Sequence, residues 1–431
     1  MAQDLASRIL TEHAATLTAL PDTGSAAHRR RVLERLTALG VPSAREENWK
    51  YANLRPLERV RFTPAPARTP PNDICAQLPQ PLAGYVRHVF IDGRHAAELS
   101  APASVPAGVR LQPLAVDATA GGSLESSSGD RRFALLNEAF APAGMAVSLE
   151  ANATACLELV FVASTAAESA ASYPRIAVSV APGAQLTLVE QHLSLGSDAS
   201  FVNAAIAIEI ASGGSLRHCR LQQLGTRALW LDTLAVTLQS HASYQLHGIA
   251  LGSGSARSSL EARILGSRAQ VALSLASVAG GHQTHDVLAR VEHVAPEART
   301  KQVFRGIAAQ RARVACNGKI VVGAQARGTD SRQSLRGLLA GAEAEIDVRP
   351  QLEIYTDEVR CSHGATTGKL DETMLFYLLS RGIAPEIAQQ LLKWAFLEDV
   401  IASIPVPELR RRIEASLAGR MSESQALQEL L

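Results

Sequence analysis

Short apolar runs alternate with polar or small residues between positions 145 and 360, and this period of two predicts β-strands. A weak repeat runs through the same stretch: a turn residue, then Ala or Gly, then a polar or small residue, then the start of a strand. Its copies lie roughly 27 to 30 residues apart, except before the last, and this spacing is typical of repeat architectures. The copies are Gly183–Leu186, Gly213–Leu216, His241–Tyr244, Arg268–Val271, Glu297–Thr300 and Glu343–Ile346.

The repeat favours a parallel β-helix over the other β-rich folds. Amphipathic helical patterns of about 10–15 residues are missing between the strands, which argues against a doubly wound α/β sheet. An antiparallel sandwich remains the alternative, but Asn317–Gly318 is the one clear hairpin signal. We therefore expect a mainly β protein with a right-handed parallel β-helix, in which small corner residues let successive coils approach closely.

Helical periodicity returns at both ends of the chain. Apolar spacing in Leu5–Leu10 and in Val32–Leu39 predicts N-terminal helices, with Gly40 as a C-cap. Asp371 is a suitable N-cap for a helix over Glu372–Ser380, and Pro385 suits the first turn of the next helix. The predicted regions are an N-terminal helical region (1–62), a proline-rich linker (63–80), the β-helix core (81–364, most regular from about 145) and a C-terminal helical region (365–431).

Composition excludes several classes of function. The net charge of the 431 residues is +1, which gives no electrostatic case for binding nucleic acid or an acidic membrane. The five cysteines form no Cys-x-x-Cys pair, so neither a zinc finger nor a self-contained ferredoxin-type cluster is expected. Neither a signal-peptide pattern nor an uninterrupted apolar run of about 18 residues is present, so we expect a soluble, cytoplasmic protein.

The strongest candidate for a functional site is the pair Cys361 and His363. Side chains two residues apart on a strand face the same side, so a thiol and an imidazole would project together, as a pair of metal ligands does. The alternative is structural, because cysteine is often simply buried and a histidine at a strand end is often a capping group. His282 and His285 are a weaker candidate metal pair, and more commonly such residues lie in turns.

A phosphate loop is excluded within the same segment. Gly364 and Gly368 are separated by three residues instead of four, and Leu370 follows Lys369 where Ser or Thr is needed to hold magnesium. Nucleotide binding is therefore not expected here.

Three segments together resemble the SufB/SufD family of the SUF iron–sulfur cluster assembly system. They are Asp357–Asp371 continued by Leu375–Ile383, Gly323–Gln333, and Glu46–Tyr51 with Leu54. SufB-like members carry Glu in place of Ser362 and of Gly364, so this chain is similar to the SufD side. It lacks the acidic residue that SufB is thought to use as a cluster ligand.

The resemblance implies a non-catalytic scaffold subunit. It would pair with a SufB-like subunit through the β-helix edge and bind a SufC-like ATPase, which carries the ATPase activity, through its C-terminal helices. Cys361 and His363 carry over as candidate iron or cluster ligands, shared with the partner. No cofactor is expected to be stably bound by this chain alone, only transient iron or an Fe–S cluster in the complex.

Three alternatives remain open at this stage. Besides a SufD-type scaffold, the chain could be a SufB-like paralogue, a homodimeric β-helix interaction protein without a cluster role, or a β-helix enzyme of the polysaccharide-lyase kind. The last class needs an acidic calcium cluster, and the sequence contains no cluster of aspartates. A homodimer is also expected for the isolated subunit, because an edge that is built for a partner can pair with itself.

Overall fold

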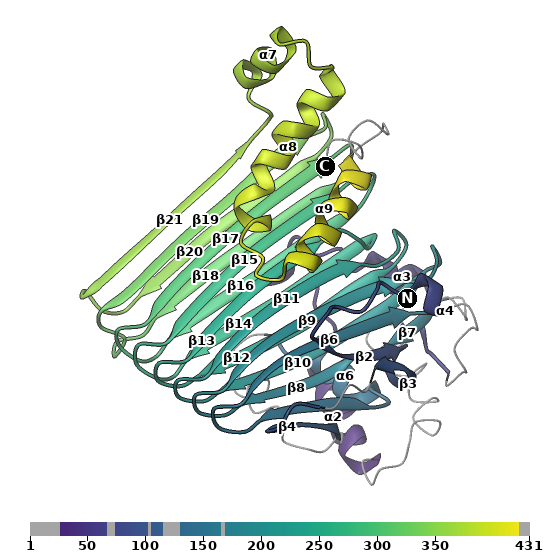
Figure 1. Cartoon of the computed structure of the whole chain (residues 1–431), viewed down its shortest axis with the longest axis vertical. Helices are drawn as coiled ribbons and strands as arrows, with labels where there is room; N and C mark the ends of the chain where they lie inside the picture. Colours follow the sequence, from purple (N-terminus) through teal and green to yellow (C-terminus); the bar gives the residue numbers. More distant parts are fainter. Residues whose placement is uncertain (1–25, 67–73, 102–104, 115–129, 165–168, 422–431) are drawn as a thin grey trace.

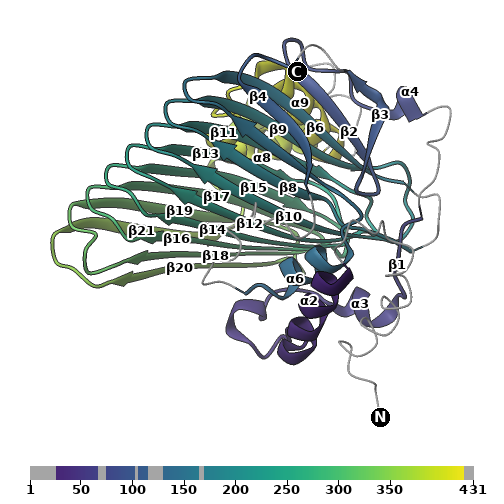
Figure 2. The ribbon, with the colours of Figure 1, turned by 90° about the horizontal axis from the view of Figure 1, so that it is seen from below.

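A two-sheet β-solenoid of about seven turns forms the body of the molecule, and 48 % of the chain is in strands. Figures 1 and 2 show this computed structural model, in which successive strands alternate between two stacked sheets and helices lie at the two ends of the chain. The mainly β, β-helix prediction is therefore confirmed. The structure describes residues 26–66, 74–101, 105–114, 130–164 and 169–421, so the predicted helix over Leu5–Leu10 lies outside the described residues.

Each coil contributes one strand to each sheet, and the coils pair in parallel from β5 and β6 onward. Sheet A contains β1 (Thr63–Pro64), β4 (Val109–Leu114), β5 (Gly144–Leu149), β7 (Ala170–Ser172), β8 (Arg175–Val180), β10 (Ser200–Ile210), β12 (Leu229–Leu238), β14 (Ser255–Ile264), β16 (Thr284–His293), β18 (Arg313–Val322) and β20 (Glu345–Ile354). Sheet B contains β2 (Val86–Ile91), β3 (Arg94–Ala101), β6 (Thr154–Ala163), β9 (Gln185–Ser194), β11 (Ser215–Gln223), β13 (Ser243–Ala250), β15 (Gln270–Ala279), β17 (Arg299–Ala309), β19 (Thr329–Ala340) and β21 (Val359–Gly368). Antiparallel pairs, β2 with β3 and β4 with β5, lie at the N-terminal end of the solenoid.

The repeated turn residues are the corners that lead into sheet B. Gly183, Gly213, His241, Arg268 and Glu297 all have φ between 59° and 71°, the left-handed region. A residue in this conformation reverses the chain sharply between two strands, so the repeat in the sequence reflects a repeat in backbone geometry. The sixth copy differs, because Glu343 precedes β20 of sheet A. The next corner of the sheet B series is Gly328, with φ of 71°, which explains the longer interval.

The main core lies between the two sheets, where inward-facing Val, Leu, Ile and Ala side chains from every coil pack together. Because side chains alternate along a strand, the outward face of each sheet is available for the helices. Leu36 of α2 and Phe133 of α6 cover part of sheet A, and Leu397 of α8 and Leu409 of α9 cover part of sheet B. The helices therefore lie on opposite sides of one solenoid (Figure 2).

The helices of the described residues are α2 (Ala26–Leu39), η2 (Glu47–Trp49), α3 (Arg55–Arg59), α4 (Ile74–Gln77), α6 (Arg132–Phe140), α7 (Glu372–Ser380), α8 (Pro385–Ile401) and α9 (Pro407–Met421). Two predicted caps are confirmed: Gly40, with φ of 71°, ends α2, and the Asp371 side chain accepts hydrogen bonds from the first turn of α7. Among the described residues, no helix is both long and apolar enough to cross a membrane.

The element boundaries differ from the predicted regions in three places. The proline-rich stretch contains β1, which pairs in parallel with β7, and the short helix α4. A helix, α6, lies within the range that was predicted as β-helix. The predicted boundary at residue 364 falls inside β21, which continues to Gly368 because its backbone still pairs with β19 there.

Candidate functional site

Cys361 and His363 lie on β21, the last strand of sheet B, which pairs with β19 and, in the part of the chain that the structure describes, with no second strand. Its other side is an open edge, as is that of β20, the last strand of sheet A. The two-residue spacing puts both side chains on the same face of the strand, as predicted. Cys361 packs with Val359 against Ile320 and Val322 of sheet A, so this face is the interior of the solenoid where it opens at the last coil.

The interior becomes polar directly behind this pair. Cys361 is in register with Ser331, and His363 with Gln333. Both β19 side chains are buried, and the Gln333 amide donates a hydrogen bond of 2.9 Å to the Gln302 amide oxygen one coil further in. A buried amide or hydroxyl is costly unless it is hydrogen-bonded, so the Gln333–Gln302 hydrogen bond helps to maintain this polar lining at the open end.

The environment of Cys361 favours the thiol over the thiolate. Partial burial, and then the negative charge of Asp330, raises the pKa of Cys361. A thiol with a raised pKa is a poor nucleophile, whereas a bound metal ion would displace its proton. The Cys361 thiol is therefore better suited to metal coordination than to nucleophilic attack.

Two side chains do not complete a coordination sphere. Within the part of the chain that the structure describes, no group of three or more His, Cys, Asp or Glu residues is placed to hold a metal ion. Gly364 leaves its outward side empty as well, since a Cβ added there would meet nothing within 4 Å. Sulfur and nitrogen donors suit iron, and these two side chains would supply only part of its coordination sphere.

His282 and His285, the weaker candidate metal pair, do not form a site in the structure. His282 is exposed in a turn, whereas His285 is buried and hydrogen-bonded through Nδ1 to the Ser277 hydroxyl at 2.8 Å. The segment from Gly364 to Gly368 is extended strand, so it cannot wrap a phosphate group.

The N-terminal motif Glu46–Tyr51 has a structural role that sequence reasoning did not predict. The Trp49 indole donates a 2.6 Å hydrogen bond to Asp130, and the Arg257 guanidinium lies 4.7 Å from the centre of its ring. Glu47 pairs with Arg349 on the edge strand β20. The motif thus fastens the N-terminal region across the last coils of sheet A.

A second feature missed from the sequence is a buried charged network inside the solenoid. Glu190 accepts hydrogen bonds from His192, His218 and Arg220, and Arg220 also pairs with Asp232. All five residues point inward from neighbouring strands. The signal was present in the sequence as polar residues at alternating, inward positions of two strand-like runs.

Comparison with known proteins gives the family. Residues 161–396, from β6 to α8, match the family model for the SufBD core domain of the SUF system of FeS cluster assembly. The chain belongs to this family. The match includes Cys361 and His363 and confirms the resemblance that the sequence motifs indicated.

Named relatives agree with the family assignment. The iron–sulfur cluster assembly protein SufD of Escherichia coli is 28 % identical over 404 residues, covering 90 % of this chain and 91 % of that protein. A SufBD family protein of Synechocystis is 26 % identical over 408 residues, covering 91 % and 90 %. The chloroplastic protein ABCI7 of Arabidopsis thaliana is 26 % identical over 250 residues, covering 58 % and 53 %.

Proposed function

We propose that this chain is a SufD-type scaffold subunit that supports iron–sulfur cluster assembly without being an enzyme itself. The single observation that carries the proposal is the position of Cys361 and His363 on β21, whose outer edge pairs with no other strand of the described residues. An unpaired strand edge is a template for a strand of another chain. A SufB-like subunit that adds to this edge would bring its own donors to the pair.

Iron or a nascent cluster is the cargo of this site. Cys361 would supply a thiolate once its proton is displaced, and His363 would supply a ring nitrogen. The polar lining formed by Ser331 and Gln333 supports the proposal, because hydrogen bonds to cluster sulfur atoms and to ligands stabilise such centres. In this proposal the chain assists iron entry, and Cys361 and His363 supply part of the ligand set of the iron or cluster.

The C-terminal helices are the proposed contact with a SufC-like ATPase. Helix α7 has no buried residue and stands away from the solenoid, whereas α8 and α9 pack against sheet B (Figure 1). Met374, Phe376 and Tyr377 are all more than half exposed on α7. An apolar helix face of this kind in a folded protein is typical of a protein-binding surface.

The proposal is tested by co-expression with SufB-like and SufC-like partners and purification of the complex. The wild-type chain is expected to form it, and the absence of any complex would overturn the proposal. In the complex, His363→Ala should leave subunit composition unchanged but lower the iron bound and the rate of cluster maturation by about tenfold or more. His282→Ala, an exposed histidine of the same solenoid, is the matched control and should mature clusters normally. Normal maturation with His363→Ala would make His363 a structural residue.

A further inference from the structure

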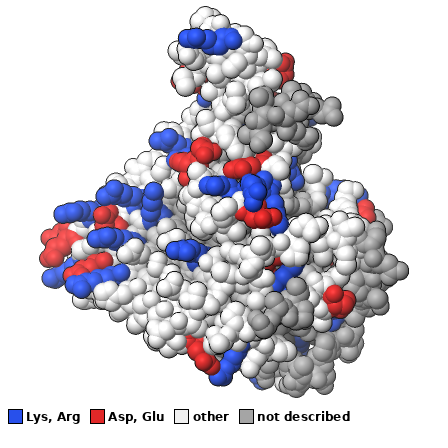
Figure 3. Space-filling view, in the orientation of Figure 1, with Lys and Arg blue, Asp and Glu red and all other residues white. Residues whose placement is uncertain are grey.

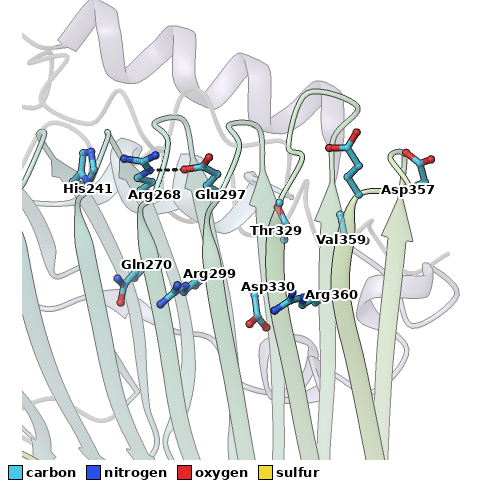
Figure 4. Close-up of a pocket in the computed structure, with 12 residues that line it drawn as sticks. His241, Arg268, Gln270, Glu297, Arg299, Thr329, Asp330, Asp357, Val359 and Arg360 are labelled. Carbon is cyan, nitrogen blue, oxygen red and sulfur yellow. Dashed lines mark hydrogen bonds and ion pairs between the residues drawn. The ribbon is translucent and has the colours of Figure 1, made fainter.

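A groove of about 750 Å³ lies on the outer face of sheet B, beside the open edge and on the opposite side of β21 from Cys361 and His363. Figure 4 shows its two tiers: the corners His241, Arg268 and Glu297 above, and strand residues below. Figure 3 shows charged side chains gathered over the starts of these strands, at the left of the view. The lower tier contains Gln270, Arg299, Asp330 and Arg360.

The lower tier is a ladder in strict register. Arg299 of β17 lies opposite Asp330 of β19, and Asp330 lies opposite Arg360 of β21. The charge therefore alternates, positive, negative, positive, as the sheet approaches its edge. Opposite charges on directly opposed residues stabilise neighbouring strands, and like charges destabilise them.

The carboxylates of the groove are mostly engaged already. Glu297 pairs with Arg268, and Glu358 lies 3.6 Å from Arg327. Asp330 lies 3.4 Å from Arg332, on the side of the ladder away from the corners. Among the described residues, Arg299 and Arg360 have no ion-pair partner within 4 Å, and neither does Asp357 in the turn before β21. Arg360 therefore brings an unpaired guanidinium to the edge strand itself.

We propose that Arg360 selects the partner chain. The strand that extends sheet B beyond β21 presents an Asp or Glu opposite Arg360, so that the alternating ladder continues across the interface. This inference rests on the proposed pairing at the β21 edge and specifies its chemistry. The ladder favours a carboxylate over an apolar or basic side chain, because a cation at that position would face Arg360 directly.

The test measures the affinity of the full-length chain for its SufB-like partner at low and high salt. Arg360→Lys should bind within about threefold of wild type, and Arg360→Glu should bind at least about tenfold more weakly at low salt. The difference between wild type and Arg360→Glu should shrink at high salt, because an interaction at the rim is screened. Arg217→Glu is the matched control: this exposed arginine lies on the same outer face, on β11, and the variant should bind as wild type does.

A charge swap identifies the opposing residue. Each Asp and Glu of the partner's last strand is changed in turn to Lys, and one of these variants should restore the binding of Arg360→Glu. Wild-type affinity for Arg360→Glu, equal losses in Arg217→Glu and Arg360→Glu, or failure of every swap would overturn the inference while the pairing itself stands. If the wild-type chain forms no complex at all, the proposed function fails instead.

Discussion

Glu190 is a buried carboxylate that stays ionised inside the solenoid. Burial alone would raise the pKa of Glu190, but Arg220 and then the histidines outweigh it and hold the pKa well below its usual value. The carboxylate therefore stays charged inside the tube, where it accepts three sets of hydrogen bonds. Such a group is tolerated only when every partner is in place, so the network fixes one arrangement of β9, β11 and β12.

Three other buried histidines predict how stability depends on pH. Burial lowers the pKa of His247, His285 and His293 to about 4. In the unfolded chain each would titrate near 6.5, so the unfolded state binds more protons between these values. Their contribution to stability is therefore complete above about pH 6.5 and is lost as the pH falls. At pH 5 the loss is about 2 kcal/mol for each histidine.

The measurement is urea unfolding at pH 8 and pH 5, at one protein concentration. Replacement of a buried histidine, His285→Gln, should reduce the loss of unfolding free energy between the two pH values by about 2 kcal/mol. His282→Gln, three residues away and exposed, should keep the wild-type dependence on pH. If the unfolding free energy of His285→Gln depended on pH as that of the wild type does, His285 would be protonated in the folded state at pH 5 and the prediction would be wrong.

Strands and corners of the solenoid can be predicted from the sequence where a single residue determines a corner. The left-handed corners repeat, so five of the six copies were found at the turns before sheet B. The N-terminal motif was not interpretable in this way, because its partners Arg257, Arg313 and Arg349 come from three different coils. Contacts of that kind have no period along the chain. The thiol–imidazole pair was placed correctly on one strand face, but the open edge beside it depends on where the last coil ends.

The exposed aromatic side chains of α7 are expected to contribute to partner binding and not to stability. Phe376 is 71 % exposed and contributes nothing to a core, so Phe376→Ala should change the unfolding free energy by less than about 0.5 kcal/mol. The same change should weaken binding of the SufC-like ATPase by about tenfold, because exposed aromatic anchors dominate interfaces. Isothermal titration calorimetry with the purified ATPase measures this. Leu39→Ala, at an apolar residue of α2 that is 58 % exposed, is the control. Unchanged ATPase binding by Phe376→Ala would remove α7 from the interface.

The whole molecule is a solenoid whose two ends differ: antiparallel strands lie at the N-terminal end and parallel strands at the other. Antiparallel strand pairs finish the N-terminal coils, and the helices cover the outer faces of both sheets. At the other end β20 and β21 expose two strand edges side by side. This asymmetry concentrates three features at a single end: the thiol–imidazole pair, the charge ladder and the unpaired backbone. The open end also makes self-association the natural competitor of partner binding.

We expect that a charged side chain on the edge strand β21 prevents self-association through the open end. A Cβ added at Gly364 would meet nothing within 4 Å, so Gly364→Lys should leave the fold intact while a lysine on the edge disfavours strand pairing. Light scattering after size exclusion should give a mass that rises with concentration for the wild-type chain and stays monomeric for Gly364→Lys. Gly419→Lys, on the exposed side of α9 and equally free of clashes, should behave as wild type. A dimer that persists in Gly364→Lys would place the self-contact elsewhere and leave the β21 edge free for a different chain.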